Sequence, residues 1–122
     1  MGNILRYLIP LLVGALLLFG CAETLIIGSD LDRTGLVDGV YEGSYSGGPN
    51  SVLVKVTIKD STIVNIEIVR HRAWKGRKAE STILRRIIEN QSTDVAAVTG
   101  ATNSSRVIMN AVQKAIEKAS EN

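Results

Sequence analysis

Hydrophobic and polar residues alternate with a period of two through the middle of the chain. A first run, residues 52–58, has an apolar residue at every second position. A second run, residues 63–69, resumes after a tight turn at 60–61. Its predicted apolar face is Val64, Ile66 and Ile68. This alternation is typical of half-buried strands and predicts an antiparallel hairpin over 52–69 with one face toward solvent.

Two later segments have apolar residues at helical spacing. Between Lys78 and Asn90 these are Ile83, Leu84, Ile87 and Ile88. The second segment carries a longer stripe: Val107, Ile108, Ala111, Val112, Ala115, Ile116 and Ala119. Its predicted outer face is Asn110, Lys114, Glu117 and Lys118. The spacing predicts two amphipathic helices.

The hairpin and both helices each have an apolar face to cover. A shorter strand is predicted over 39–45, before the turn signal Gly-Gly-Pro-Asn at 47–50. The most economical arrangement is an α+β domain in which a small antiparallel sheet carries two amphipathic helices packed on one face.

Fourteen of the first 20 residues are apolar. A single charge, Arg6, precedes the apolar run from Tyr7 to Phe19, which is the layout of a secretory signal. The stretch from Ile4 to Phe19 has 16 residues, fewer than the roughly 20 that cross a bilayer comfortably. The pattern predicts an N-terminal signal peptide or membrane-anchor helix over 1–20.

The tetrapeptide Leu18-Phe19-Gly20-Cys21 resembles the bacterial lipobox, in which the cysteine is acylated and becomes the new N-terminus. Cys21 is the single cysteine, so a disulfide framework and a multi-cysteine metal site are excluded. Cleavage with lipidation at Cys21 and an uncleaved anchor both remain open. The chain is therefore divided into a signal or anchor (1–20), a tether (21–37) and one domain (38–122).

Length and charge narrow the classes of function. The chain has 122 residues and a formal net charge of +2, so the part after the signal can bury one modest core and has no room for a separate cofactor domain. Aromatic residues make up 4%, which argues against the base-stacking platforms of nucleic-acid binders. We expect one small exported domain with no nucleic-acid partner.

The two predicted helices are joined through the sequence Val-Thr-Gly-Ala-Thr-Asn-Ser-Ser at 98–105. Hydroxyl and amide side chains commonly cap helix starts, which is one interpretation. The other is an anion site, because Gly100 permits a tight turn and Thr102 falls at the helix start, where free N–H groups favour a phosphate. The lysine and the glycine spacing of a nucleoside-triphosphate loop are missing, so the segment does not indicate phosphoryl transfer.

Thr99-Gly100-Ala101-Thr102 resembles the flavinylation motif, Ser/Thr-Gly-Ala-Thr, of the FMN-binding domain family. The Asp-Gly-Val-Tyr-Glu-Gly run at 38–43, the hairpin, His71 and the helix at 107–119 resemble that family in the same order. The resemblance implies that a flavin transferase, using FAD and a divalent metal, esterifies the phosphate of FMN to Thr102. The cofactor-binding residues that we expect are Thr99, Gly100, Ala101, Thr102, Asn103, Ser104, His71 and Trp74.

Members of this family occur as subunits of ion-pumping complexes and as small exported lipoproteins that relay electrons. A chain with an export signal followed by one domain is most similar to these exported lipoproteins. The resemblance therefore implies an FMN-binding electron-transfer protein, anchored in the membrane on the extracytoplasmic face of a bacterial cell envelope and served by a redox partner protein. It implies a carrier more than a stand-alone enzyme.

Two other functions stay open, a flavin-free binding or structural lipoprotein of the same fold and a small flavin-dependent reductase. Ala96 keeps the first of these open, because the family pattern usually has an acidic residue six positions before the acceptor, and the nearest acid is Asp94. Noncovalent FMN is open for the same reason.

Basic residues crowd the connection after the hairpin. They are Arg70, His71, Arg72, Lys75, Arg77 and Lys78, around Trp74. One interpretation is a solvated connection, a second is a rim over the flavin where cations steady the reduced ring and Trp74 stacks on it, and a third is contact with anionic lipid. His71 is the single histidine, so a multi-histidine metal site is excluded.

Overall fold

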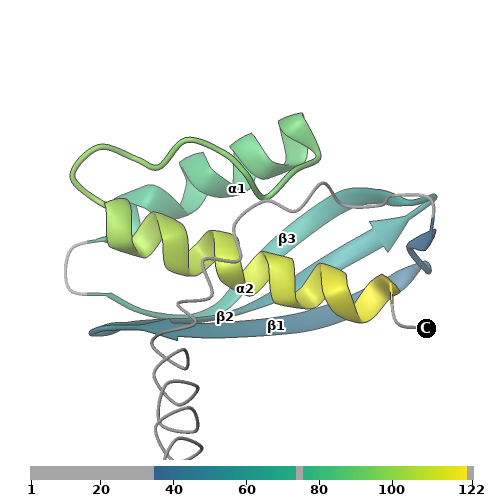
Figure 1. Ribbon diagram of the computed structural model, residues 1–122, viewed down its shortest axis with the longest axis horizontal. Coiled ribbons are helices and arrows are strands. Elements are labelled where there is room, and N and C mark those ends of the chain that lie inside the picture. The colour runs from purple at the N-terminus through teal and green to yellow at the C-terminus, as the bar shows by residue number, and fades with distance from the viewer. Residues whose placement is uncertain (1–34, 74–75, 121–122) are drawn as a thin grey trace, which may run out of the picture.

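The structure is a computed structural model that describes residues 35–73 and 76–120. Its elements are β1 (Gly39–Gly47), β2 (Asn50–Lys59), β3 (Thr62–Arg72), the short 3-10 helix η3 (Gly76–Ala79), α1 (Glu80–Asn90) and α2 (Thr102–Ser120). Helices lie over an antiparallel sheet (Figure 1), so the predicted α+β class is confirmed. The predicted N-terminal helix and Cys21 lie outside the described residues. Among those that are described, no helix has the length and hydropathy needed to cross a membrane.

The three strands form an antiparallel meander with β2 at its centre. Two-residue turns, Gly48-Pro49 and Asp60-Ser61, join them. The predicted alternation along β2 is confirmed, because the residues at every second position are at most 3% exposed while the residues between them are more accessible: the buried ones are Val52, Val54, Val56 and Ile58. Strand β2 therefore supplies the middle of the core.

The side-chain pattern of β3 differs from the prediction at Val64. Thr57 pairs with Asn65 whereas Ile58 pairs with Ile63, so the register shifts between these two pairs and leaves Val64 as the extra residue of a bulge. Val64 is 48% exposed and Ile63 is 3% exposed. The prediction is wrong here because the one extra residue reverses which side chains of β3 face the core. A strict alternation of apolar and polar residues cannot show where such a bulge occurs.

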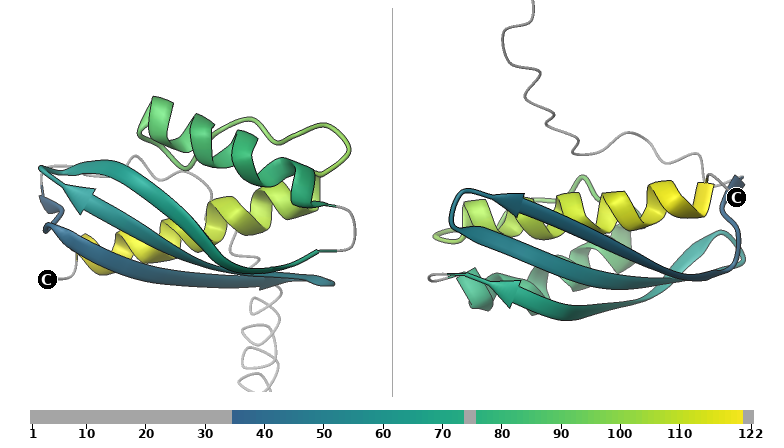
Figure 2. Two further views of the ribbon diagram at one scale, coloured as in Figure 1. Left: turned by 180° about the vertical axis from the view of Figure 1, so that it is seen from behind. Right: turned by 90° about the horizontal axis from the view of Figure 1, so that it is seen from below.

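Both helices lie on the same face of the sheet (Figure 2). Helix α2 packs on β1 and β2, and α1 packs on β3. The close approach of α2 depends on Gly43, where a Cβ atom would overlap the carbonyl oxygen of Ala111. Helix α1 begins at Glu80, later than predicted, because η3 occupies the residues before it.

The predicted apolar stripe of α2 is confirmed, since all seven of its residues are at most 1% exposed. The predicted outer face is wrong at Asn110, which is 4% exposed. The segment between α1 and α2 packs near this residue, and there the buried Thr93 Oγ1 donates a hydrogen bond of 2.7 Å to Gln113 Oε1. Gln113 lies one turn after Asn110 on the same side of the helix, so α2 is covered on more than its sheet-facing side.

Candidate functional site

The motif residues 99–102 form a turn that leads directly into α2. Gly100 has a φ of +81°, a left-handed conformation that costs little only for glycine. The N–H of Ala101 closes the turn by donating to the carbonyl oxygen of Val98 at 3.0 Å. Thr102 is the first residue of α2 and is exposed. The predicted position of Thr102 at a helix start is therefore confirmed.

The start of α2 supplies backbone donors beside Thr102. The first α-helical hydrogen bond runs from the N–H of Ser105 to the carbonyl oxygen of Ala101 at 2.9 Å. The N–H groups of residues 102–104 therefore have no acceptor within the helix. The helix dipole adds partial positive charge at this end, and no acidic side chain lies in the first turn to oppose it. A phosphate on the Thr102 hydroxyl would be stabilised by these groups.

Ser105 holds the turn in place from inside the domain. Its side chain is fully buried; the hydroxyl donates to the carbonyl oxygen of Ala101 at 2.7 Å and accepts from the N–H of Val98 at 3.0 Å. The sequence did not single out Ser105, and the structure gives it the role of positioning the motif.

Farther along the segment before the motif, Nη1 of Arg86 donates to the carbonyl oxygen of Ala96 at 2.6 Å.

A small pocket of about 150 Å³ lies beside Thr102. It is lined by Asn50, Gly76, Gly100, Ala101, Thr102, Asn103 and Ser104. Asn103 joins this end of α2 to the tip of the β1–β2 hairpin, because its Nδ2 donates to the carbonyl oxygen of Gly47 at 3.3 Å. Ser104 packs so closely on Gly76 that a Cβ there would overlap its side chain. Five of the predicted cofactor-binding residues thus line one pocket, whereas Thr99 is exposed and is not part of its lining.

Asn50 is the pocket residue that the sequence analysis missed. The structure places it at the first position of β2, where it is 7% exposed and its Oδ1 is buried without a hydrogen-bond partner. Such an unpaired oxygen costs about 1–3 kcal/mol, so a ligand group that donates to it would be favoured. The sequence does contain a clue to Asn50, since it continues the every-second-residue pattern of Val52 and Val54 and so falls on the buried face of the strand. A polar side chain on that face needs a hydrogen-bond partner.

Lys78 brings a positive charge to the motif. A Cβ atom placed on Gly100 would lie 3.0 Å from the Nζ of Lys78. Lys78 is exposed, and within residues 35–73 and 76–120 no carboxylate pairs with it. The sequence placed Lys78 only in the basic connection; the fold brings its ammonium group over the motif turn.

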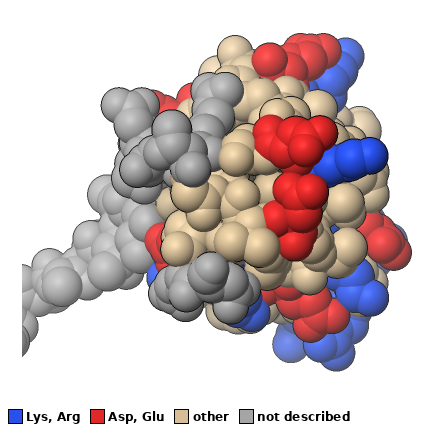
Figure 3. Space-filling model, turned by 90° about the vertical axis from the view of Figure 1, so that its right-hand side faces the viewer, with Lys and Arg blue, Asp and Glu red and all other residues tan. Residues whose placement is uncertain are grey.

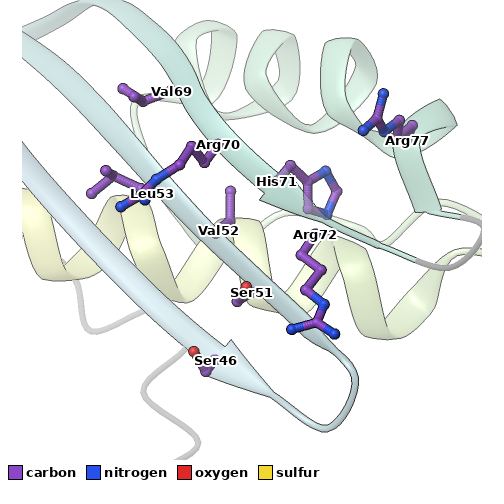
Figure 4. Close-up of a pocket in the computed structure, with 9 residues that line it drawn as sticks. All are labelled: Ser46, Ser51, Val52, Leu53, Val69, Arg70, His71, Arg72 and Arg77. Carbon is purple, nitrogen blue, oxygen red and sulfur yellow. The ribbon is translucent and has the colours of Figure 1, made fainter.

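The residues around His71 form a larger hollow of about 700 Å³ (Figure 4). Arg70, Arg72 and Arg77 contribute to its lining. The His71 side chain is 2% exposed, and its Nδ1 lies 2.6 Å from Oε1 of Glu80. Across the described part of the chain, no three metal-ligating side chains converge, here or elsewhere. Trp74 and Lys75 lie outside the described residues, so their predicted roles stay predictions.

The two ends of the domain differ in charge. The motif end carries four exposed basic residues: Arg72, Arg77, Lys78 and Arg106. At the other end the N–H of Asp60 donates to Oδ1 of Asp38 at 2.9 Å. Figure 3 looks onto that end, where acidic side chains gather near the centre and basic ones lie mostly toward the margin. This polarity favours an anionic ligand at the motif end.

Comparison with known proteins finds a family match that spans this region of the chain. The family model described as FMN-binding domain matches residues 46–117, which include the motif and all four exposed basic residues of the motif end. A protein of Treponema pallidum (strain Nichols), named only as an uncharacterized protein, is 33% identical over 87 residues, 66% of this chain and 23% of that protein. The chain therefore spans about a quarter of the length of this relative.

Proposed function

Because the chain belongs to the FMN-binding domain family and FMN is its cofactor, we propose that it is an electron-transfer protein that carries FMN as a phosphoester on Thr102. The observation that carries this proposal is the exposed Thr102 hydroxyl at the first residue of α2, beside a pocket lined by the motif.

The residues around Thr102 fit the phosphate end of FMN. At about 150 Å³ the pocket is smaller than the roughly 300–1,000 Å³ of typical ligand sites, so it suits the phosphate and the adjoining part of the ribityl chain. Free N–H groups of α2 would donate to the phosphate oxygens. Lys78 would balance the phosphate charge, and Oδ1 of Asn50 would accept from a ribityl hydroxyl.

When bound, FMN supplies reversible redox chemistry, and the protein supplies attachment, orientation and electrostatics. Thr102 provides the oxygen of the ester. Gly100 leaves the approach to that oxygen free of a side chain, and Ser105 fixes the turn through two hydrogen bonds. An electron carrier needs no separate substrate pocket, so these residues are sufficient for the proposed role.

The proposal includes a place in the cell, the extracytoplasmic face of a bacterial membrane. Its support is the apolar segment 1–20 and the lipobox-like sequence that ends at Cys21. A redox partner protein would exchange electrons with the FMN there. The Cys21→Ser variant should accumulate in membranes as an unprocessed precursor while the parent protein is processed and incorporates labelled fatty acid. Equal processing of both would contradict lipidation.

The attachment is tested by coexpressing the full chain with a flavin transferase and measuring intact mass and flavin fluorescence on a denaturing gel. The parent protein should gain the mass of FMN less water. Thr102→Ala should gain nothing, while the matched variant Thr62→Ala, which changes an exposed threonine at the start of β3 outside the pocket, should keep the modification. Equal modification of Thr102→Ala and the parent would contradict the proposal.

Noncovalent binding of FMN is the second candidate, and Ala96 is the observation that favours it. The missing carboxylate removes one feature that a transferase could recognise. The backbone at this position is nevertheless held by Arg86, whose bond goes to the carbonyl oxygen and does not depend on the side chain at 96. This candidate predicts a protein that binds FMN but gains no mass in the same experiment.

A further inference from the structure

One face of the sheet has no helix over it. Both helices pack on the face that carries Val52, Val54 and Val56 (Figure 2). Ser51 and Leu53 point to the opposite face, here called the outer face, because side chains alternate along a strand. An antiparallel sheet can leave such a face to water or present it to a partner. Its composition therefore decides what the outer face can contact.

Two arginines lie on the outer face at the hairpin-tip end. The register places Arg72 directly opposite Ser51. It places Arg70 directly opposite Leu53, and residues opposite each other share a face. Figure 4 shows both side chains extending from β3 over this face, whereas His71 between them lies opposite a core residue. Both arginines are exposed, and no carboxylate of the described residues forms an ion pair with either.

Apolar side chains accompany these arginines. Val69, the extra residue of the register shift before Arg70, is 39% exposed and lines the same hollow as Leu53. Val40 is 61% exposed and lies on the outer face as well, since it pairs with Thr57. Guanidinium groups bind phosphate while their stems and apolar neighbours cover apolar surface. This combination suits the boundary between lipid headgroups and acyl chains.

The middle of the outer face has the opposite charge. Glu42, Lys55 and Glu67 lie in one row across the three strands, with Nζ of Lys55 3.9 Å from Oε1 of Glu42. Two carboxylates around one ammonium group leave this row net negative. An anionic surface is therefore attracted at the arginines and repelled at the middle row, so contact is expected at the hairpin-tip end alone.

The chain between Cys21 and the domain is long enough for this contact. The 13 residues 22–34 span at most about 45 Å when fully extended. Strand β1 has nine residues, or about 30 Å, and runs from near Gly35 to the hairpin tip. A domain attached to a membrane through Cys21 can therefore bring its far end to the bilayer, and the attachment raises the effective concentration of the arginines there.

We infer that the hairpin-tip end of the outer face docks on an anionic phospholipid surface through Arg70 and Arg72. The inference rests on the proposed membrane attachment and goes further by giving the domain an orientation. The guanidinium groups bind lipid phosphates, and Leu53 and Val69 lie at the headgroup boundary. Helix α2, which begins at Thr102, lies on the other face of the sheet, away from the lipid.

The docking is tested with the full chain, expressed without a flavin transferase, in nanodiscs of phosphatidylcholine with or without phosphatidylglycerol. Trp74 is the single tryptophan and follows Arg72 by two residues. Quenching of its fluorescence by lipids that are spin-labelled near the headgroup reports how close this end lies to the bilayer. Stronger quenching is expected in the anionic discs, and added salt should weaken it. Equal quenching in the two kinds of disc would overturn the inference.

Variants identify the residues responsible. In anionic discs, Arg70→Gln/Arg72→Gln should lower the equilibrium constant for contact roughly fivefold per arginine, whereas Arg70→Lys/Arg72→Lys keeps the charge and should keep the contact. The matched control, Arg85→Gln/Lys114→Gln, removes the same charge from the two helices and should behave like the parent.

The outcomes separate this inference from the proposed membrane attachment. An equal loss of quenching in Arg85→Gln/Lys114→Gln would show an effect of net charge and overturn the docking at Arg70 and Arg72. A chain that co-purifies with the discs but shows no preference for anionic lipid would overturn the docking alone. A chain that does not co-purify with the discs would contradict the membrane attachment and, with it, the docking.

Discussion

The hydroxyl of Ser105 donates a hydrogen bond of 2.7 Å to the carbonyl oxygen of Ala101, and so ties the first turn of α2 to the motif in front of it. Because the same hydroxyl accepts from the N–H of Val98, Ser105→Ala should cost about 1–3 kcal/mol of unfolding free energy. For a domain of this size that is a melting-temperature decrease of roughly 4–8 °C per kcal/mol, which differential scanning fluorimetry can measure. Ser81→Ala, at an exposed site on α1, should leave the melting temperature unchanged, and an equal value for Ser105→Ala would contradict the role of this bond.

The contact between Gly43 and Ala111 sets the distance between β1 and α2. In Gly43→Ala the new Cβ would overlap the carbonyl oxygen of Ala111, so the helix must move away from the sheet at a cost of about 1–3 kcal/mol or more. Urea titration should show a lower midpoint. Gly35→Ala is the matched control because nothing lies within 4 Å of its Cβ position. Unchanged stability of Gly43→Ala would show that the two layers do not depend on this contact.

Much of the fold follows from local patterns. The alternation along β2 and the apolar stripe of α2 both reflect burial on a single face, which a period in the sequence records directly. Thr102 could be placed at a helix start for the same local reason, since hydroxyl residues after a glycine turn are typical of that position. These predictions need no knowledge of which segments meet.

The features that the sequence did not predict depend on contacts between distant segments. Val64 faces solvent because of a register shift against β2, and Asn110 is buried although a helical period puts it on the polar side. Likewise, only the fold brings Asn50 and Lys78 to the motif. Among these four residues, only Asn50 has a local clue in the sequence, because it continues the buried face of β2 and is polar.

The position of Lys78 over Gly100 predicts an electrostatic effect on flavin attachment. Lys78→Gln should slow modification by the transferase roughly two- to fivefold, which corresponds to the 0.5–1 kcal/mol that an exposed charge contributes. The initial rate is measured by intact mass at fixed transferase concentration and low salt. Lys59→Gln, an exposed lysine at the opposite end of the sheet, should retain the parent rate. A similar decrease in both variants would point to net charge instead of a local contact.

Ala96 offers a test by gain of function. The backbone at this position is already held by Arg86, so Ala96→Asp supplies the missing side chain without a change of loop geometry. Its modified fraction at an early time point should exceed that of the parent. Ala96→Asn has nearly the same shape without the charge and should behave like the parent. If Ala96→Asp is no faster, the acidic residue of the family pattern is dispensable in this chain.

The central claim, that Thr102 is the attachment point, is tested most directly by locating the flavin in a tryptic peptide. Trypsin is expected to release residues 87–106, since Arg86 and Arg106 bound a stretch that contains no other basic residue. Fragmentation of this peptide distinguishes Thr102 from the other hydroxyl residues within it. The account predicts the mass of FMN less water on Thr102. The same mass on Thr93, Thr99 or any of the serines, or a peptide without added mass from transferase-treated protein, would contradict it.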